Sequence, residues 1–182
     1  TGVVDAATAR ALNDPASKPL KLAAVATGVG KSNGDPGGRL SHANMNPDVR
    51  RLANKVIVDL QAQGLKPYVV DGYRSFADQN KAYERGNSQV KGGGSWHNYG
   101  LAVDFAWWDE AGKAPTWSPK DPKVWNALGS AGKAAGFTAW GGDWGWDKPH
   151  LEYHPKYDKS AAYGVKPIFD KGGLQAVWDH VT

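Results

Sequence analysis

Residues 101–106, LAVDFA, alternate strictly in side-chain character, the pattern of a β-strand with one buried face. The larger apolar side chains take alternate positions and point to one face: Leu101, Val103 and Phe105. Asp104 points to the other face, between two alanines. Because alanine is small, this carboxylate has room in front of it, as a metal or ligand site requires.

Helical patterns stand on both sides of this strand. Asn46 before Pro47 predicts a helix start, because asparagine caps the free backbone N–H groups and proline fits the first helical position. Apolar residues then recur at three- and four-residue spacing until Gly64 ends the helix. A capping-box pattern at Ser75 begins a second helix that runs towards Gly86.

Further segments complete the expected fold. We expect short strands over residues 66–70, 137–140 and 150–153, and helices over residues 122–135 and 174–180. Helices and short strands mixed in this order predict an α+β fold, with a small, mostly antiparallel sheet flanked by helices.

The composition excludes several classes of function. The chain of 182 residues has no cysteine, which excludes disulfides and thiolate zinc sites. Its formal net charge of +4 favours anionic surroundings, but its basic residues are scattered rather than gathered in a nucleic-acid-binding stripe. No stretch approaches the roughly 20 apolar residues that span a bilayer, and no signal-peptide pattern is visible. We therefore expect neither a nucleic-acid partner nor membrane insertion.

The chain also carries nine tryptophans and seven tyrosines. We expect most of these aromatic side chains in the core, and a minority lining a groove for a polymeric or sugar-containing ligand. Residues 27–47 are rich in Gly, Pro, Ser and Asn, which is typical of linkers and loops. We accordingly divide the chain into residues 1–39 and a main domain of residues 40–182.

His97, Asp104 and His150 can supply two imidazoles and one carboxylate. Catalytic zinc commonly has three such protein ligands and keeps a fourth position open for water. His97 lies in the loop just before the strand that carries Asp104, and His150 opens another strand. Neighbouring antiparallel strands would bring the three side chains together, although capping or core roles for the two histidines remain an alternative at this point.

Three further acids near His150 are candidates for a general base. Asp147 lies three residues before His150 across a Lys-Pro turn, so both can converge on one site. Asp143 and Glu152 are rivals, and Glu152 shares the face of His150 and could instead be its hydrogen-bond partner. Arg74, at a strand-to-helix junction, is either a surface salt-bridge residue or a group that binds a carboxylate or a developing oxyanion.

Three segments in this order resemble the LAS or M15 family of zinc peptidases: DGYRSFADQNKAYERG, GGGSWHNYGLAVDF and GFTAWGGDWGWDKPHLE. The similarity covers residues 46–153 and includes the S-x-H-(x)6-D element. It is strongest to phage endolysins and bacterial enzymes that cut the L-alanyl-D-glutamate bond of peptidoglycan. The resemblance implies the α+β fold shared with D-Ala-D-Ala metallopeptidases and the hedgehog signalling domain. Leu151 stands where the commonest family form has phenylalanine, a conservative apolar change.

The resemblance also implies roles for individual residues. It assigns the zinc ligands to His97, Asp104 and His150, the general base to Asp147, and transition-state support to Arg74. It further implies that Ser95, the serine of the S-x-H element, helps to hold the substrate. The first residues, TGVVDAATARAL, resemble the end of a peptidoglycan-binding repeat, so we expect residues 1–39 to be the remnant of such a module plus a linker.

The expected function is thus a zinc-dependent peptidoglycan hydrolase that cleaves the L-alanyl-D-glutamate bond. A D-alanyl-D-alanine carboxypeptidase or dipeptidase of the same family is the alternative. A non-haem iron oxygenase and a non-catalytic, zinc-containing wall-binding module are more distant ones. We expect a monomer that acts on the bacterial cell wall, delivered by phage or secreted.

Overall fold

The computed structural model describes residues 34–159 and 161–182. The predicted remnant of a peptidoglycan-binding module lies outside these residues, except for residues 34–39. Those six residues pack with the rest of the fold: the Gly34 carbonyl accepts a hydrogen bond from Val69 N at 2.5 Å. The Asp35 carboxylate accepts from the backbone N–H groups of Arg39 and Leu40, both at 2.8 Å. The assignment of the preceding residues stays a prediction.

The helix predicted after Asn46 is confirmed as α2 (Pro47–Ala62). The Asn46 side chain accepts from the backbone N–H groups of Asp48 and Val49, at 2.8 and 3.3 Å, so it caps the helix as expected. One face of α2 is buried: Val49, Leu52, Ala53, Val56, Ile57 and Leu60. The helix packs this face against the sheet and against α4 (Val124–Ala135).

The sheet has five strands in the order β1–β2–β5–β4, with β3 pairing β2, and every pair is antiparallel. Its strands are β1 (Pro67–Asp71), β2 (Ala102–Asp109), β3 (Ala114–Thr116), β4 (Ala139–Trp140) and β5 (His150–Glu152). With its helices this makes the predicted α+β fold, which is confirmed. The second predicted helix is α3 (Phe76–Glu84), capped by Ser75, whose Oγ accepts from Asp78 N at 3.1 Å.

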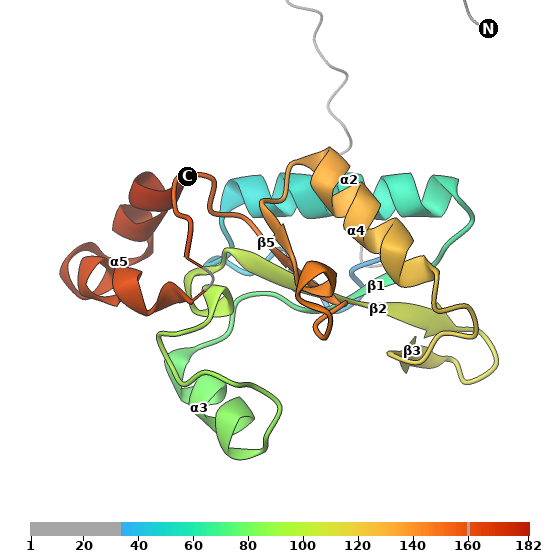
Figure 1. Cartoon of the computed structure of the whole chain (residues 1–182), viewed down its shortest axis with the longest axis horizontal. Helices are drawn as coiled ribbons and strands as arrows, with labels where there is room; N and C mark the ends of the chain where they lie inside the picture. The colour runs from blue at the N-terminus through green and yellow to red at the C-terminus, as the bar shows by residue number, and fades with distance from the viewer. Residues whose placement is uncertain (1–33, 160) are drawn as a thin grey trace, which may run out of the picture. The chain divides into compact units, whose positions relative to one another are not determined.

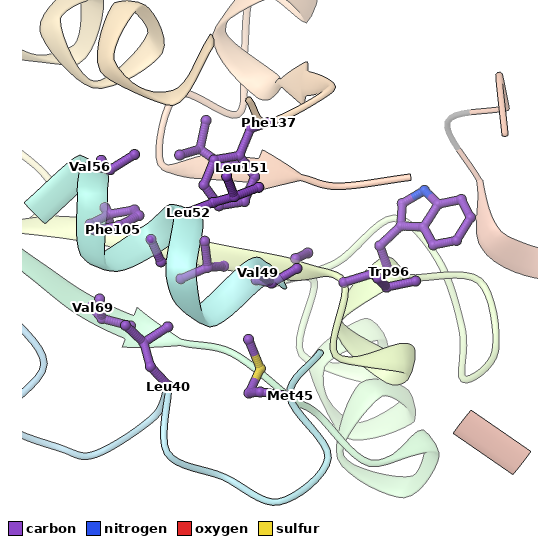
Figure 2. Packing of buried hydrophobic residues seen from close by; sticks show 14 of the residues in the cluster. Leu40, Met45, Val49, Leu52, Val56, Val69, Trp96, Phe105, Phe137 and Leu151 are labelled. Atoms are coloured by element: carbon purple, nitrogen blue, oxygen red, sulfur yellow. The ribbon is translucent and has the colours of Figure 1, made fainter. Parts of the chain in front are cut away.

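The two faces of the sheet have different roles. Figure 1 shows α2 and α4 together on one side of the sheet and α3 on the other. The apolar core fills the space under α2, where Val69, Phe105 and Leu151 from the strands meet Leu52 from the helix (Figure 2). Asp104 points to the opposite face, away from this core. The alanines on either side of Asp104 are buried as well, whereas the Asp104 side chain keeps 20% of its surface exposed.

Some elements differ from the sequence predictions. The central strand continues past residue 106 to Asp109, turns back and pairs with β3. Trp107 in this extension packs edge-on against Trp125 of α4, with ring centroids 5.6 Å apart. The last helix, α5 (Lys166–Val181), begins eight residues earlier than predicted. The helix is kinked at Gly173, whose φ of 68° is a backbone conformation that glycine adopts easily. Only the half after Gly173 was recognised as a helix from the sequence.

Three short 3₁₀ turns connect these elements: η1 (Trp96–Tyr99), η2 (Gly141–Trp144) and η3 (Ala162–Val165). None was predicted. Among the described residues, no helix has both the length and the apolar character needed to cross a membrane.

Candidate active site

His97 is held in a tight turn just before β2. Ser95 caps the turn η1 by accepting from His97 N at 3.3 Å, and Gly100 ends it with a φ of 66°. A Cβ at Gly100 would lie 1.9 Å from the carbonyl oxygen of Asn44, so only glycine fits there. The His97 ring is buried, and its Nδ1 lies 2.6 Å from the carbonyl oxygen of Gly72. Because a carbonyl only accepts, Nδ1 carries a proton, and Nε2 faces Asp104.

Asp104 and His150 are directly paired across β2 and β5. Opposite residues of an antiparallel pair share a face of the sheet, so both side chains point towards His97. Asp104 Oδ1 lies 2.7 Å from His150 Nδ1, and Asp104 Oδ2 lies 3.2 Å from His97 Nε2. One potential ligand atom from each of the three residues lies within 4.8 Å of the others. The structure thus brings together the three residues that the sequence singled out.

The donor set fits a divalent metal. His150 Nε2 lies 2.9 Å from Glu152 Oε1, so a proton held on Nε2 would leave the Nδ1 lone pair for a metal. His97 Nε2 and His150 Nδ1 lie 3.2 Å apart, and each also faces an oxygen of Asp104. Tetrahedral zinc with bonds of about 2.0–2.1 Å sets neighbouring ligand atoms roughly 3.3 Å apart, close to this spacing.

The electrostatics of the buried cluster also favour a cation. Burial alone would lower the pKa of His150, but the carboxylates of Asp104 and Glu152 outweigh it and raise the pKa well above its usual value. Burial alone would likewise raise the pKa of Asp104, yet the neighbouring histidines hold it well below its usual range. Each carboxylate therefore stays ionised and attracts positive charge to the space between the two imidazoles.

Arg74 lies beside this cluster in a fixed position. Its Nε donates to Asp71 Oδ2 at 2.9 Å, its Nη2 also contacts that carboxylate, and its Nη1 donates to Gln79 Oε1 at 2.9 Å. Nη2 lies 3.9 Å from Asp104 Oδ2. The buried Gln79 is anchored in turn by the Val90 carbonyl at 2.8 Å. These contacts hold the Arg74 guanidinium towards the cluster before any ligand binds.

The three candidate bases occupy different surroundings. Asp147 is half-buried at the cluster, and burial is the main cause that raises its pKa. Asp143 is exposed and pairs with Lys133 at 2.7 Å, outside the cleft lining. Glu152 is buried, and its Oε1 lies within hydrogen-bond distance of His150 Nε2. This contact fits the alternative in which Glu152 is a hydrogen-bond partner of His150. Of the three, Asp147 has the position and environment that suit a general base.

The structure has a cleft of about 670 Å³ at the cluster. Ser95, Arg74, Asp147 and the three cluster residues all contribute to it. The lining also includes residues 86–90, together with Trp144 and Trp146, which are 37% and 58% exposed.

The sequence reasoning did not identify the parts played by Asp71, Gln79, Trp144 and Trp146. The two tryptophans had one signal in the sequence, because they directly precede Asp147 in a glycine-rich segment. The contacts of Arg74 with Asp71 and Gln79 are visible only in three dimensions.

Comparison with known proteins agrees with this geometry. A family model of M15 peptidases, described as D-alanyl-D-alanine carboxypeptidase, matches residues 88–153. The peptidoglycan L-alanyl-D-glutamate endopeptidase CwlK of Bacillus subtilis (strain 168) is 31% identical over 128 residues, which cover 62% of this chain and 75% of the relative.

A solved structure shares the fold. The crystal structure of the Serratia marcescens L-Ala D-Glu endopeptidase ChiX superposes with a TM-score of 0.52 at 23% identity, covering 68% of this chain and 88% of that chain. The likeness to the Bacillus relative extends over most of that protein's length. On that similarity, the chain belongs to the M15 family of peptidases.

Proposed function

We propose that this peptidase is a zinc-dependent peptidoglycan hydrolase that cleaves the L-alanyl-D-glutamate bond of the stem peptide. The observation that carries the proposal is the convergence of His97, Asp104 and His150 in a cleft that Asp147 and Arg74 also line. The bond is suggested by the Bacillus relative, whose name gives it that activity.

We assign the metal ligands to His97 Nε2, His150 Nδ1 and the Asp104 carboxylate. Two imidazoles and a carboxylate are a common ligand set of catalytic zinc. Bound zinc would supply Lewis acidity and lower the pKa of a coordinated water to about 7. Gly72 and Glu152 hold the two histidine rings in the tautomers that this ligand set needs.

We assign proton transfer, charge stabilisation and substrate binding to three other residues of the cleft. The Asp147 carboxylate accepts a proton from the attacking water and later returns it to the leaving amine. The Arg74 guanidinium stabilises negative charge on the carbonyl oxygen as it develops. Because Asp71 and Gln79 already orient Arg74, little reorganisation is needed at the moment of reaction. Ser95 lines the same cleft, and we assign it to substrate binding.

A D-alanyl-D-alanine carboxypeptidase is the second candidate, because the matching family model carries that description. The same five residues would serve either reaction. The difference lies in how the cleft receives the residues on either side of the scissile bond.

The finer parts of the proposal concern where the protein acts. We propose that its substrate is bacterial wall peptidoglycan, outside the cytoplasmic membrane, and that it works as a monomer. A lytic role of the endolysin type belongs to the same proposal, as does the assignment of residues 1–39 to a wall-binding module and linker.

Mass spectrometry of purified peptidoglycan digested with this protein, with and without a zinc chelator, tests the proposal. We expect new fragments that begin at glutamate and that disappear with the chelator. Loss of terminal D-alanine alone would move the protein to the carboxypeptidase reaction. Wall material that is bound but never cleaved would overturn the catalytic assignment.

A further inference from the structure

A second cavity lies beside the cleft on the same face of the sheet. Its volume is about 670 Å³, and Trp144 and Glu152 line both this cavity and the cleft. Ala139 of β4 lines it too and is paired with Glu152 of β5, so the two share a face. Glu152 is two residues from His150 in β5 and lies on the face of that residue as well. The second cavity therefore continues the cleft from β5 towards the edge strand β4.

Residues 155–158 form another part of the lining, and backbone hydrogen bonds hold them in place. Lys156 N donates to the carbonyl of Val181, in the last helix, at 3.0 Å. Tyr157 N donates to the His154 carbonyl, also at 3.0 Å. This segment is therefore positioned before any ligand binds, which lowers the cost of ordering it around one.

Two charged side chains of this segment, Lys156 and Asp158, line the cavity and are exposed. Within the described part of the chain, neither the Lys156 ammonium nor the Asp158 carboxylate has an ion-pair or hydrogen-bond partner. Thr138, by contrast, is already engaged, because its Oγ1 accepts from His154 N at 2.9 Å. The cavity thus offers one positive and one negative charge, which complement a ligand that carries both an ammonium and a carboxylate.

The spacing fits a stem peptide whose L-alanyl-D-glutamate bond lies at the cluster. His150 and Glu152 are two residues apart in β5, which is roughly 7 Å along the strand. D-Glutamate in stem peptides is linked through its γ-carboxyl, so it is two carbon atoms longer than an α-linked residue and spans roughly 6 Å. The residue after D-glutamate therefore reaches the second cavity. In many bacterial walls that residue is a diamino acid.

We infer that the second cavity binds the residue after D-glutamate in the stem peptide, and that it selects a diamino acid whose side chain ends in both an ammonium and a carboxylate, such as meso-diaminopimelate. Asp158 pairs with the ammonium and Lys156 with the carboxylate. The inference rests on the proposed cleavage of the L-alanyl-D-glutamate bond, which sets D-glutamate beside the cluster.

The test is an NMR titration of the full-length protein, with one equivalent of zinc, by the dipeptide γ-D-glutamyl-meso-diaminopimelate. This peptide lacks the L-alanyl bond, so its binding is measured without turnover. We expect the backbone amide signals of Ala139, Lys156 and Asp158 to shift. An analogue with norleucine in place of diaminopimelate has no charge on its side chain. Because each exposed ion pair contributes about two- to fivefold in affinity, we expect the analogue to bind roughly four- to twentyfold more weakly.

Variants separate the charges from the space of the cavity. Lys156→Gln and Asp158→Asn should each weaken the diaminopimelate peptide by about two- to fivefold and leave the norleucine peptide unchanged. Lys159→Gln, at an exposed lysine outside the lining, is the control and should bind both peptides as wild type. Ala139→Leu puts bulk into the cavity and should weaken both peptides.

Equal affinity of the two peptides for the wild-type protein, or shifts confined to the cleft, would overturn the inference. Shifts of Ala139, Lys156 and Asp158 on adding N-acetylmuramoyl-L-alanine, and not the peptide, would place the sugar side of the substrate in the cavity and overturn it as well. A failure of the proposed function is a separate result, since it would appear as peptidoglycan digests without fragments that begin at glutamate, whatever the affinity of the peptide.

Discussion

Asp143 and Asp147 lie in one short, tryptophan-rich segment, yet their carboxylates have different surroundings. Asp143 is exposed and pairs with Lys133, whereas Asp147 is half-buried in the cleft. Gly141 allows this placement, because a Cβ there would lie 2.1 Å from the Asp147 carbonyl oxygen. The two aspartates therefore offer a matched pair for testing the base.

We predict that Asp147→Asn keeps stoichiometric zinc but loses hydrolysis by about 10²–10⁴-fold, the usual contribution of a general base. The amide has nearly the same shape but cannot accept the proton. Zinc content by mass spectrometry and turnover on peptidoglycan are the two readouts. Asp143→Asn is the control and should retain both, while wild-type turnover in Asp147→Asn would remove that residue from its role.

His97→Ala should lose bound zinc, because it removes one of the three proposed ligands and leaves two. The zinc content of the purified variant, measured after dialysis against metal-free buffer, gives the result. His180→Gln, an exposed histidine on α5, should keep its zinc. Stoichiometric zinc in His97→Ala would show that the ligand assignment is wrong.

We assign the exposed indole of Trp146, which lines the cleft, to substrate binding away from the reacting atoms. Trp146→Ala should therefore raise KM by several-fold to tenfold with little change in kcat. Trp117, which is 57% exposed and outside the cleft lining, is the matched control. An equal effect of Trp117→Ala, or a loss confined to kcat, would contradict a substrate-binding role for Trp146. Steady-state kinetics on a soluble stem peptide separate the two parameters.

At the scale of elements, α2 tests how far local sequence determines structure. Asn46→Ala removes the side-chain acceptor for two backbone N–H groups and should lower the free energy of unfolding by about 1 kcal/mol. Gln61→Ala, an exposed change near the other end of the helix, should stay within about 0.5 kcal/mol. Urea denaturation followed by circular dichroism measures both, and equal stabilities of the two variants would contradict the capping role.

Elements with strong local signals could be predicted from the sequence. The cap at Asn46, the alternation around Asp104 and the glycine after α4 each mark a structure by short-range physics. The β2–β3 hairpin was missed because Trp107 is buried by a distant contact with Trp125, which no local pattern reveals. The first half of α5 was missed because Gly173 interrupts its periodicity.

The residues of the site likewise fall into those that local sequence predicts and those that depend on distant contacts. Its His, Asp and Arg residues stand in motifs whose spacing is visible in the sequence. The partners that orient them come from separate elements: the Gly72 carbonyl holds His97, Gln79 holds Arg74, and His154 contacts Glu152. Such contacts depend on the register of the sheet and the packing of turns, which the sequence alone did not provide.

At the scale of the described fold, the cluster joins elements far apart in the chain. His97 precedes β2, Asp104 lies within it and His150 opens β5, so a metal held by all three ties these segments together. Free zinc at 100 times its Kd should add about 2.7 kcal/mol to the free energy of unfolding. For a chain of this size that corresponds to a rise in Tm of roughly 5–10 °C. Calorimetry with zinc and with chelator measures it, and an unchanged Tm would argue against binding to the folded protein.

The most direct test of the central claim is a zinc titration of the metal-free protein, with peptidoglycan hydrolysis followed at each step. We predict no hydrolysis without metal, a linear rise as zinc is added, and a plateau at one equivalent. Full hydrolysis by the metal-free protein, or no recovery at any zinc concentration, would contradict a catalytic zinc held by His97, Asp104 and His150.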